Sequence, residues 1–169
     1  MWLTSKLRKS KHYPWNKGIE VGQRDTFSAS DVTRIRKILA KGGRASLRDL
    51  ALFSTAIDTR LRAPDLLGLT VKEVRKSNRV MRDTLQLAAA NRGRGIRCTL
   101  SKATMSALED WIIQSDKKQS NYLFTKRTGG SLKAITARQL SRLVKNWAAG
   151  IGLDPSCYGI ESLRRTHSI

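Results

Sequence analysis

The segment of residues 46–58 is apolar almost all round, and this feature constrains the fold more than any other. Apolar residues fall on every side of the helix expected there: Leu47, Leu50, Ala51, Leu52, Phe53, Ala56 and Ile57. A helix that lacks a polar face is usually buried in the centre of a domain. We therefore predict that the 169 residues fold mostly as one domain, with residues 46–58 at its centre.

The residues that follow this helix form a turn centred on Arg62. The chain reads Thr59-Arg60-Leu61-Arg62, and Pro64 then suits the first turn of a short helix over residues 64–68. Four leucines would anchor the turn in the core: Leu61, Leu66, Leu67 and Leu69. Arg62 would then be held by a rigid frame, and a fixed guanidinium suits bidentate recognition of phosphate. Alternatively, Arg62 pairs with Asp58 or Asp65 and only ties two helices together.

Three further helices are indicated by their end signals. One begins near Ser28, where Asp31 completes a partial capping box, and ends at Gly42-Gly43. A second runs from Ser101 to about Ser115, and a third runs from a capping box at Thr136 to Gly150. These helices would supply most of the core together with the central one.

Residues 70–100 change to a period of two, which is typical of strands. We predict short strands over residues 70–74, 79–87 and 95–100, with a glycine-rich hairpin tip at residues 91–95. The expected fold class is therefore mainly α with a small three-stranded antiparallel β-sheet, an α+β arrangement.

The charge balance points to a polyanionic partner. Lys and Arg number 33 against 13 Asp and Glu, a formal charge of +20. Such an excess causes self-repulsion that a polyanion relieves, and nucleic acid is the polyanion that fits best. We expect no membrane partner, because no long apolar segment accompanies the charge. Two cysteines and two histidines at unrelated positions predict no disulfide framework and no metal site, and they fit a cytoplasmic location.

Two groups of basic residues are candidates for contact with nucleic acid. Arg92 and Arg94 stand on the hairpin tip, where they could enter a groove or contact phosphates. Arg138, Arg142 and Lys145 follow the i, i+4, i+7 spacing of one helix face, away from the apolar face. The alternative is that both groups are ordinary solvated surface.

Two segments together resemble the phage integrase, or tyrosine recombinase, family. Thr59–Leu69 is similar to the first arginine box, T-x-L-R-x-x-D/E-L-L-x-L, and Glu161–Thr166 is similar to the second, H-x-L-R-R/H-T. The resemblance covers roughly residues 28–169. It implies DNA strand breaking and rejoining through a phosphotyrosyl bond, with Arg62 and Arg164 as the catalytic arginines and no metal or nucleotide cofactor. It also implies duplex DNA as partner, and Arg165 joins the expected DNA-binding residues.

Three positions depart from the family pattern. The position of the family's hairpin lysine is Asn91 or close to it, and the first histidine of the second box is Glu161. All three tyrosines, Tyr13, Tyr122 and Tyr158, precede Arg164, whereas the family's nucleophile follows the second box. We therefore expect a C-terminally truncated form that binds DNA without cutting it.

The resemblance also sets the expected organisation. Residues 1–25 would be a basic N-terminal extension, and residues 26–169 an integrase-type catalytic domain that is incomplete at its C-terminus. The family packs a short apolar element under the site, which places Tyr122 in the core together with Leu123 and Phe124. A nucleoid-associated location and self-association on DNA would fit such a protein.

Three functional hypotheses remain open from the sequence. The first is a degenerate integrase-type domain that binds duplex DNA. The second is a fragment of an active tyrosine recombinase whose missing segment supplies the nucleophile. The third is a non-catalytic basic module that binds RNA and resembles the two boxes by chance.

Overall fold

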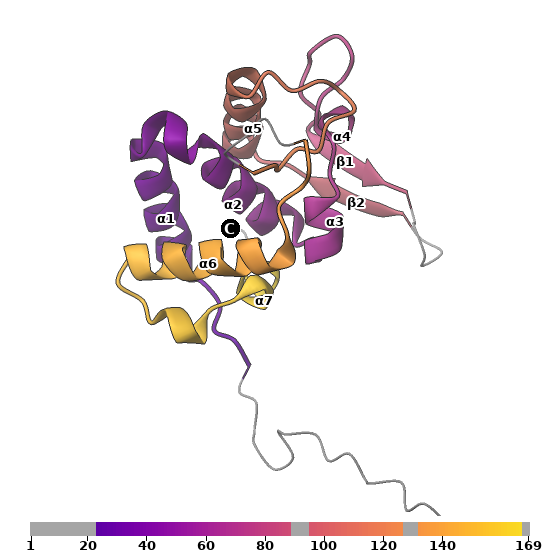
Figure 1. The fold of residues 1–169 in the computed structure, drawn as a ribbon. Coiled ribbons are helices and arrows are strands. Elements are labelled where there is room, and N and C mark those ends of the chain that lie inside the picture. Colours follow the sequence, from indigo (N-terminus) through magenta and orange to yellow (C-terminus); the bar gives the residue numbers. More distant parts are fainter. Residues whose placement is uncertain (1–22, 89–94, 127–131, 167–169) are drawn as a thin grey trace, which may run out of the picture.

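A computed structural model describes residues 23–88, 95–126 and 132–166 (Figure 1). The four long helices are α1 (Ala29–Lys41), α2 (Leu47–Thr59), α5 (Lys102–Gln114) and α6 (Ala137–Gly150). The short helices are α3 (Ala63–Leu67), α4 (Val71–Val74), α7 (Ile160–Arg165) and the 3-10 turns η1 (Gly43–Ser46) and η2 (Pro155–Cys157). The strands are β1 (Thr84–Leu87) and β2 (Ile96–Thr99), so the predicted α+β class with a mainly helical fold is confirmed.

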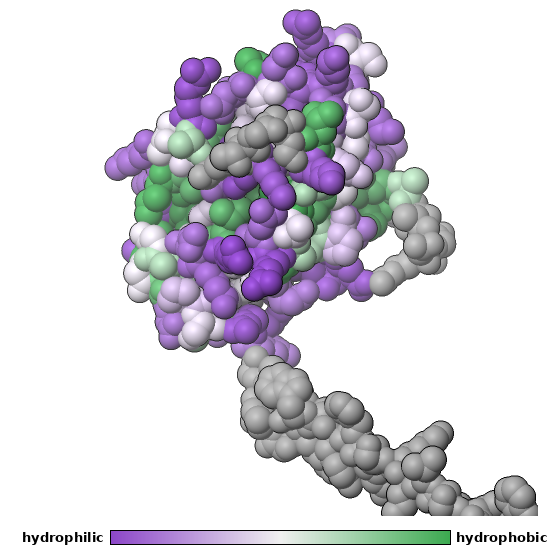
Figure 2. Space-filling view, in the orientation of Figure 1, coloured by the Kyte–Doolittle hydropathy of each residue, from purple (hydrophilic) through white to green (hydrophobic). Residues whose placement is uncertain are grey.

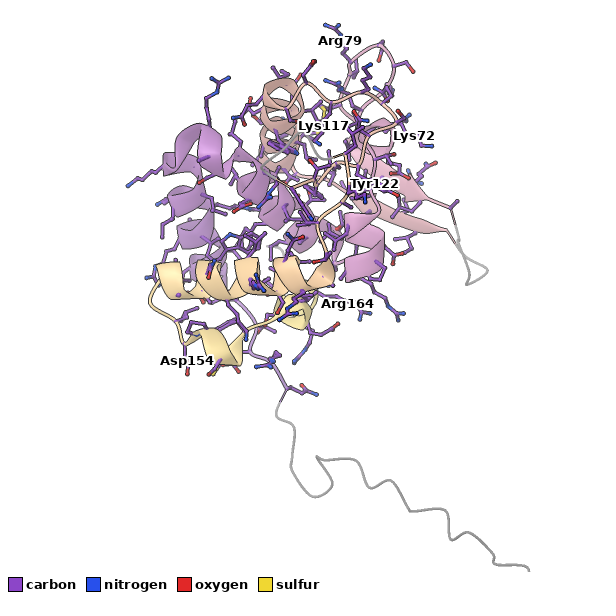
Figure 3. The ribbon with its side chains drawn as sticks, viewed as in Figure 1. Lys72, Arg79, Lys117, Tyr122, Asp154 and Arg164 are labelled. Carbon is purple, nitrogen blue, oxygen red and sulfur yellow. The ribbon has the colours of Figure 1, made fainter. Side chains whose placement is uncertain are left out.

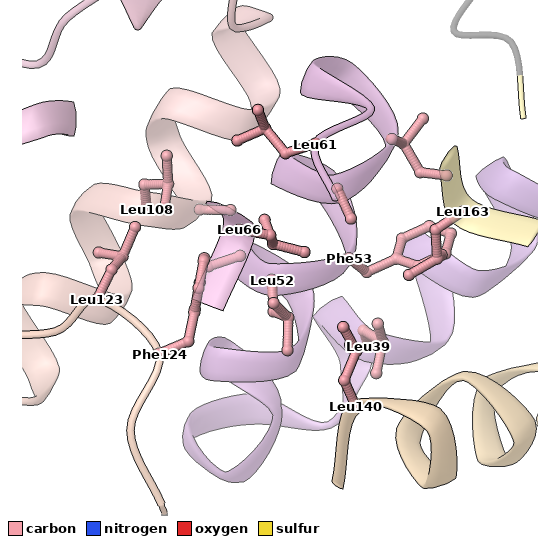
Figure 4. Close-up of a cluster of buried hydrophobic side chains, with 14 of the residues drawn as sticks. Leu39, Leu52, Phe53, Leu61, Leu66, Leu108, Leu123, Phe124, Leu140 and Leu163 are labelled. Carbon is pink, nitrogen blue, oxygen red and sulfur yellow. The ribbon is translucent and has the colours of Figure 1, made fainter. Parts of the chain in front are cut away.

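Helix α2 is the centre of the fold, as its apolar sequence predicts. Its residues Ala51, Leu52 and Phe53 are fully buried. Helices α1, α5 and α7 pack against α2, and the ring of Phe53 meets Trp147 of α6 edge to face with centroids 5.3 Å apart. Elements from both ends of the described chain are therefore held by one helix (Figures 1 and 4).

The predicted helix starts are confirmed because each has its cap. Ser28 and Asp31 form a capping box at α1, and Thr136 and Gln139 form another at α6. The side chain of Ser101 accepts a hydrogen bond from the backbone N–H of Thr104 at the start of α5. These bonds satisfy backbone donors that a helix start otherwise leaves without partners.

The described residues form a sheet of two strands, so the prediction of a strand over residues 70–74 is wrong. Strands β1 and β2 are antiparallel, with Leu85 opposite Cys98. Residues 70–74 form α4 instead, because the Glu73 carboxylate accepts the Thr70 backbone N–H at 2.6 Å in a capping box. A trace of pairing remains where Arg75 forms an isolated bridge with Met81. A local cap thus overrides the alternating pattern.

The prediction that Tyr122 lies in the core is also wrong. Its side chain is 44% exposed, whereas Leu123 and Phe124 are fully buried (Figure 4). The indole N–H of Trp111 donates to the Leu123 carbonyl at 2.7 Å and fixes this segment against α5. An isolated bridge between Thr70 and Tyr122 joins it to the start of α4.

Within the described residues, no helix has the length and apolar character needed to cross a membrane.

Candidate functional site

Arg62 stands on a turn whose neighbours are buried. Helix α2 ends at Thr59, and its C-cap Arg60 adopts a left-handed conformation (φ 52°) and donates its backbone N–H to the Ala56 carbonyl. Leu61 is buried, and exposed Arg62 is the N-cap of α3, where its carbonyl accepts the Leu66 N–H at 2.9 Å. The rigid frame predicted for Arg62 is present, and its side chain reaches solvent from it.

The alternative of an Arg62 ion pair does not describe this turn. The Asp58 carboxylate lies 3.2 Å from Arg36 and also accepts the Ser101 backbone N–H at 2.8 Å, so it is engaged elsewhere. Among the described residues, no ion pair joins Arg62 to Asp65. The Arg62 guanidinium therefore stays available to a ligand.

The second box lies on helix α7 and its C-terminal end. Ser162 and Leu163 are buried, and the Ser162 hydroxyl accepts the Gly159 backbone N–H at 3.0 Å. Arg164 lies in the last helical turn and is partly exposed. Helix α7 begins directly after the 3-10 turn η2 and Gly159. Its first turn is stabilised because the Ser162 hydroxyl accepts the backbone N–H of Gly159.

Glu161, which stands where the family has a histidine, lies beside Arg164. Its carboxylate is 3.7 Å from the Arg164 guanidinium, and the two side chains are 61% and 41% exposed. An ion pair this exposed stabilises the fold by less than about 1 kcal/mol. Its electrostatic effect on an incoming anion is nevertheless unfavourable, since it places a negative charge next to the arginine.

The fold brings the elements that carry the two boxes onto a shared set of helices. Helix α7 packs against α2 and α6, and α3 packs against α6. Figure 1 shows α3 and α7 at the same end of α6, and Figure 3 shows Arg164 at that end. The elements that carry Arg62 and Arg164, 102 positions apart in the sequence, thus both pack against α6.

The structure describes some of the other predicted DNA-binding residues but not all of them. Arg138, Arg142 and Lys145 are exposed on α6, and Leu140, Val144 and Trp147 on the same helix are buried. Arg165 is exposed and donates to the Arg24 carbonyl at 2.9 Å. Arg92 and Arg94, together with Asn91, lie outside the described residues.

The one lysine with a perturbed pKa among the described residues does not replace the missing hairpin lysine. Burial lowers the pKa of Lys117, whose ammonium donates to Thr125 Oγ1 at 2.8 Å and lies 5.4 Å from the Trp111 ring centroid. Figure 3 shows Lys117 and Arg164 well apart. Lys117 therefore belongs to the packing around α5 and not to the arginine site.

Tyr158 is unsuited to act as a nucleophile in this arrangement. It is buried and stacks on Phe27 with centroids 4.7 Å apart. Burial, with the nearby charges of Asp25 and Asp31, raises the pKa of its phenol. Both effects disfavour the phenolate.

Cys98 stands next to the arginine turn, and its thiol donates to the Thr59 carbonyl at 3.4 Å. Burial raises the pKa of this thiol, which disfavours the reactive thiolate. The described residues hold no group of three or more His, Cys, Asp or Glu side chains that could bind a metal ion. The left-handed Arg60, two residues before Arg62, is a basic neighbour of the site that the sequence patterns did not single out.

Comparison with known proteins agrees with the two boxes. The model of the phage integrase family matches residues 25–169. No curated protein sequence matches the chain. Because the family match covers most of its length, this chain belongs to the phage integrase family.

Solved structures of low sequence identity share the fold. XerH site-specific recombinase bound to difH substrate matches with a TM-score of 0.64 and 17% identity, over 85% of this chain and 41% of that chain. XerA recombinase matches with a TM-score of 0.66 and 14% identity, over 85% and 48%. The Tn1549 transposon integrase in complex with circular intermediate DNA matches with a TM-score of 0.58 and 19% identity, over 86% and 51%. The chain thus spans about half the length of these proteins or less.

Proposed function

We propose that this protein binds duplex DNA and grips one phosphodiester between Arg62 and Arg164. The observation that carries the proposal is that both arginine boxes lie on helices packed around α2 and α6, in a member of the phage integrase family. The structural relatives solved with DNA, XerH and the Tn1549 integrase, support a duplex as the partner.

The two arginines suit a phosphate on chemical grounds. A guanidinium stays charged at any physiological pH and offers paired N–H donors that match two phosphate oxygens. Two such groups on fixed elements would stabilise the negative charge that builds on a phosphate under attack more than the charge of the ground state. The chain's contribution to strand chemistry would therefore be electrostatic.

The surrounding basic residues would contact neighbouring phosphates. Arg138, Arg142 and Lys145 form an exposed stripe on α6, and Arg165 follows Arg164 on α7. Arg92 and Arg94 of the hairpin segment would add to these contacts. Each neutralised phosphate releases counterions, so affinity should fall with salt by a log–log slope of about −0.9 per phosphate.

We further propose that these 169 residues on their own leave the DNA uncut. None of the three tyrosines follows Arg164. A carboxylate at Glu161 lies beside Arg164, and Asn91 cannot donate a proton to a leaving oxygen as a lysine can. The residues present would thus hold a phosphate without supplying the nucleophile or the general acid.

Two measurements test this proposal. Binding to a fluorescent duplex should weaken steeply as the salt concentration rises, and a flat salt dependence would contradict the DNA surface. A nicked duplex that traps the phosphotyrosine adduct should give no covalent product with the 169 residues. An adduct mapped by mass spectrometry to Tyr13, Tyr122 or Tyr158 would contradict the proposed inactivity but leave DNA binding intact.

A second candidate is that the same residues serve within a longer active recombinase. The observation in its favour is that the matched recombinases and integrase are about twice as long as this chain. Reading the gene beyond the codon for Ile169, in all frames, discriminates between the candidates. A downstream tyrosine box that restores adduct formation when expressed with these residues would favour the active form. Preference for RNA over duplex DNA, unaffected by loss of Arg62 and Arg164, would overturn both.

A further inference from the structure

The outer face of the small sheet is polar and faces away from the core. Leu85 of β1 is fully buried and lies opposite Cys98 of β2 in the register. Because side chains alternate along a strand, the neighbouring pair Gln86 and Arg97 points to the other face. Both of these side chains are exposed.

This face forms one wall of a groove of about 680 Å³. Helix α4 and the turn that follows it form the other wall. The groove is lined by four cationic side chains, namely Lys72, Lys76, Arg82 and Arg97. Two carboxylates, Glu73 and Asp83, also line it, so the cations are in excess by two.

The carboxylate of Glu73 is engaged by hydrogen bonds at the start of α4. One of its oxygens accepts both the backbone N–H of Thr70 at 2.6 Å and the hydroxyl of Thr70 at 3.0 Å. Within the described parts of the chain, no ion pair joins any of the four cations to a carboxylate. Their charge is therefore not neutralised inside the protein.

The cationic wall is also positioned by the backbone. Arg82 donates its Nε–H to the Lys72 carbonyl at 3.3 Å and its backbone N–H to Val74 at 2.8 Å. The carbonyl of Lys76 accepts the side-chain amide of Gln119 at 3.2 Å. The Arg82 side chain, held in this way, loses less conformational entropy on binding an anion than a cation on a freely moving side chain.

The groove is separate from the arginine site. Figure 3 shows Lys72 and Arg164 at well-separated places, and Figure 2 shows hydrophilic side chains over much of the surface between smaller hydrophobic areas. A second hollow shares Gln86, Arg97 and Ala88 with the groove and also reaches Gly95, the first described residue after Ala88. Ala88 and Gly95 flank the segment that carries Arg92 and Arg94.

We propose that this groove binds the phosphate backbone of a second stretch of the DNA, apart from the phosphodiester held by Arg62 and Arg164. The spacing of several cations along a polar trough suits a linear array of phosphates. The trough would continue from α4 along the sheet to Ala88 and Gly95. This inference rests on the proposed function and extends it from one phosphate site to a track.

A pair of matched triple variants tests the track. In the first, Lys72→Gln, Lys76→Gln and Arg97→Gln remove three groove cations and leave Arg82, whose side chain supports α4. In the second, Lys37→Gln, Lys41→Gln and Arg44→Gln remove three exposed cations at the end of α1 and in η1. The formal charge falls by three in both, so a difference between them reports position and not net charge.

Affinity for a long duplex is measured over a range of salt concentrations for both variants. The groove variant should lower the magnitude of the log–log slope by about 0.9 for each phosphate that the groove no longer neutralises, and the α1 variant by clearly less. Equal slopes for the two variants would overturn the track while the wild-type protein still bound duplex DNA. Unlabelled poly-glutamate and unlabelled duplex can also be compared as competitors of the labelled duplex. If poly-glutamate competes more strongly, and this advantage is lost only in the groove variant, the track is overturned and the groove instead fits an acidic protein partner.

If the wild-type protein shows no salt-dependent duplex binding, the proposed function itself fails, and this result is distinct from equal slopes. Circular dichroism of both variants before titration shows whether each retains the helical fold.

Discussion

The hydroxyl of Thr166 accepts a hydrogen bond of 3.0 Å from the backbone N–H of Phe27, which lies 139 residues earlier in the chain. Both residues are buried, and the same hydroxyl donates to the Ser162 carbonyl at 2.6 Å. This bond joins the end of α7 to the segment before α1. It therefore helps to fix the helix that carries Arg164.

Replacing Thr166 with alanine should destabilise the fold. The buried Phe27 N–H would lose its acceptor, at a cost of about 1–3 kcal/mol. Thr166→Ser keeps the hydroxyl and should stay within about 1 kcal/mol of wild type. Urea unfolding followed by circular dichroism measures both, with Thr33→Ala as a control, since that hydroxyl is exposed and donates within α1. Equal losses for alanine and serine would show that the hydrogen bond contributes little.

The buried pair of Arg48 and Asp49 gives a second stability prediction. Arg48 donates Nε and Nη2 to one Asp49 oxygen at 2.9 and 2.7 Å and Nη1 to the Thr125 carbonyl at 3.2 Å. Arg48→Met should cost about 3–5 kcal/mol, because it leaves a buried carboxylate without this cation. The pair of Glu161 and Arg164 is exposed and serves as the comparison. Glu161→Gln should change the unfolding free energy by less than about 1 kcal/mol. Similar effects of the two substitutions would contradict the burial argument.

We expect the buried phenol of Tyr158 to lower the free energy of unfolding at alkaline pH. Its phenol has a raised pKa in the folded protein, so the unfolded chain ionises first as the pH rises past about 10. The contribution of Tyr158 is present below that pH and is lost above it. Tyr158→Phe should therefore flatten the alkaline fall in unfolding free energy. Tyr122→Phe, at an exposed ring, is the matched control and should leave the fall unchanged.

The basic stripe of α6 should contribute to DNA binding. Arg138, Arg142 and Lys145 are exposed, and the glutamine triple variant should reduce the salt slope by up to about 0.9 per residue. The Lys37, Lys41 and Arg44 triple variant is the control of equal charge. A reduction no larger than in that control would indicate that the stripe is solvated surface.

Local signals predicted the helices because the residues that decide them are close in sequence. Ser28 with Asp31 and Thr136 with Gln139 mark α1 and α6 correctly. The same kind of signal, Thr70 with Glu73, was outweighed by the alternating pattern around it, so α4 was predicted as a strand. A capping box satisfies two backbone donors within four residues, whereas a strand needs a partner elsewhere in the chain.

The periodicity of apolar residues does not predict contacts between residues that are far apart in the sequence. Nothing within the segment around Tyr122 distinguishes its exposed ring from the buried Leu123 and Phe124 that follow it. The expectation that the fold brings Arg62 and Arg164 together came from the two family boxes and not from local pattern, and it stays a prediction. The groove beside Lys72 and Arg97 was not predicted, since its walls come together only through the packing of α4 on β1.

Arg62 and Arg164 are proposed to hold the same phosphate, and a double-mutant cycle on duplex affinity measures whether they act on it together. Arg62→Ala, Arg164→Ala and the double variant are compared with wild type at one salt concentration. Both side chains are at least partly exposed, so the fold should persist in all three. We expect a coupling free energy of about 0.5–3 kcal/mol, with the double variant losing less than the sum of the single losses. Losses that add within about 0.3–0.5 kcal/mol would contradict a shared phosphate.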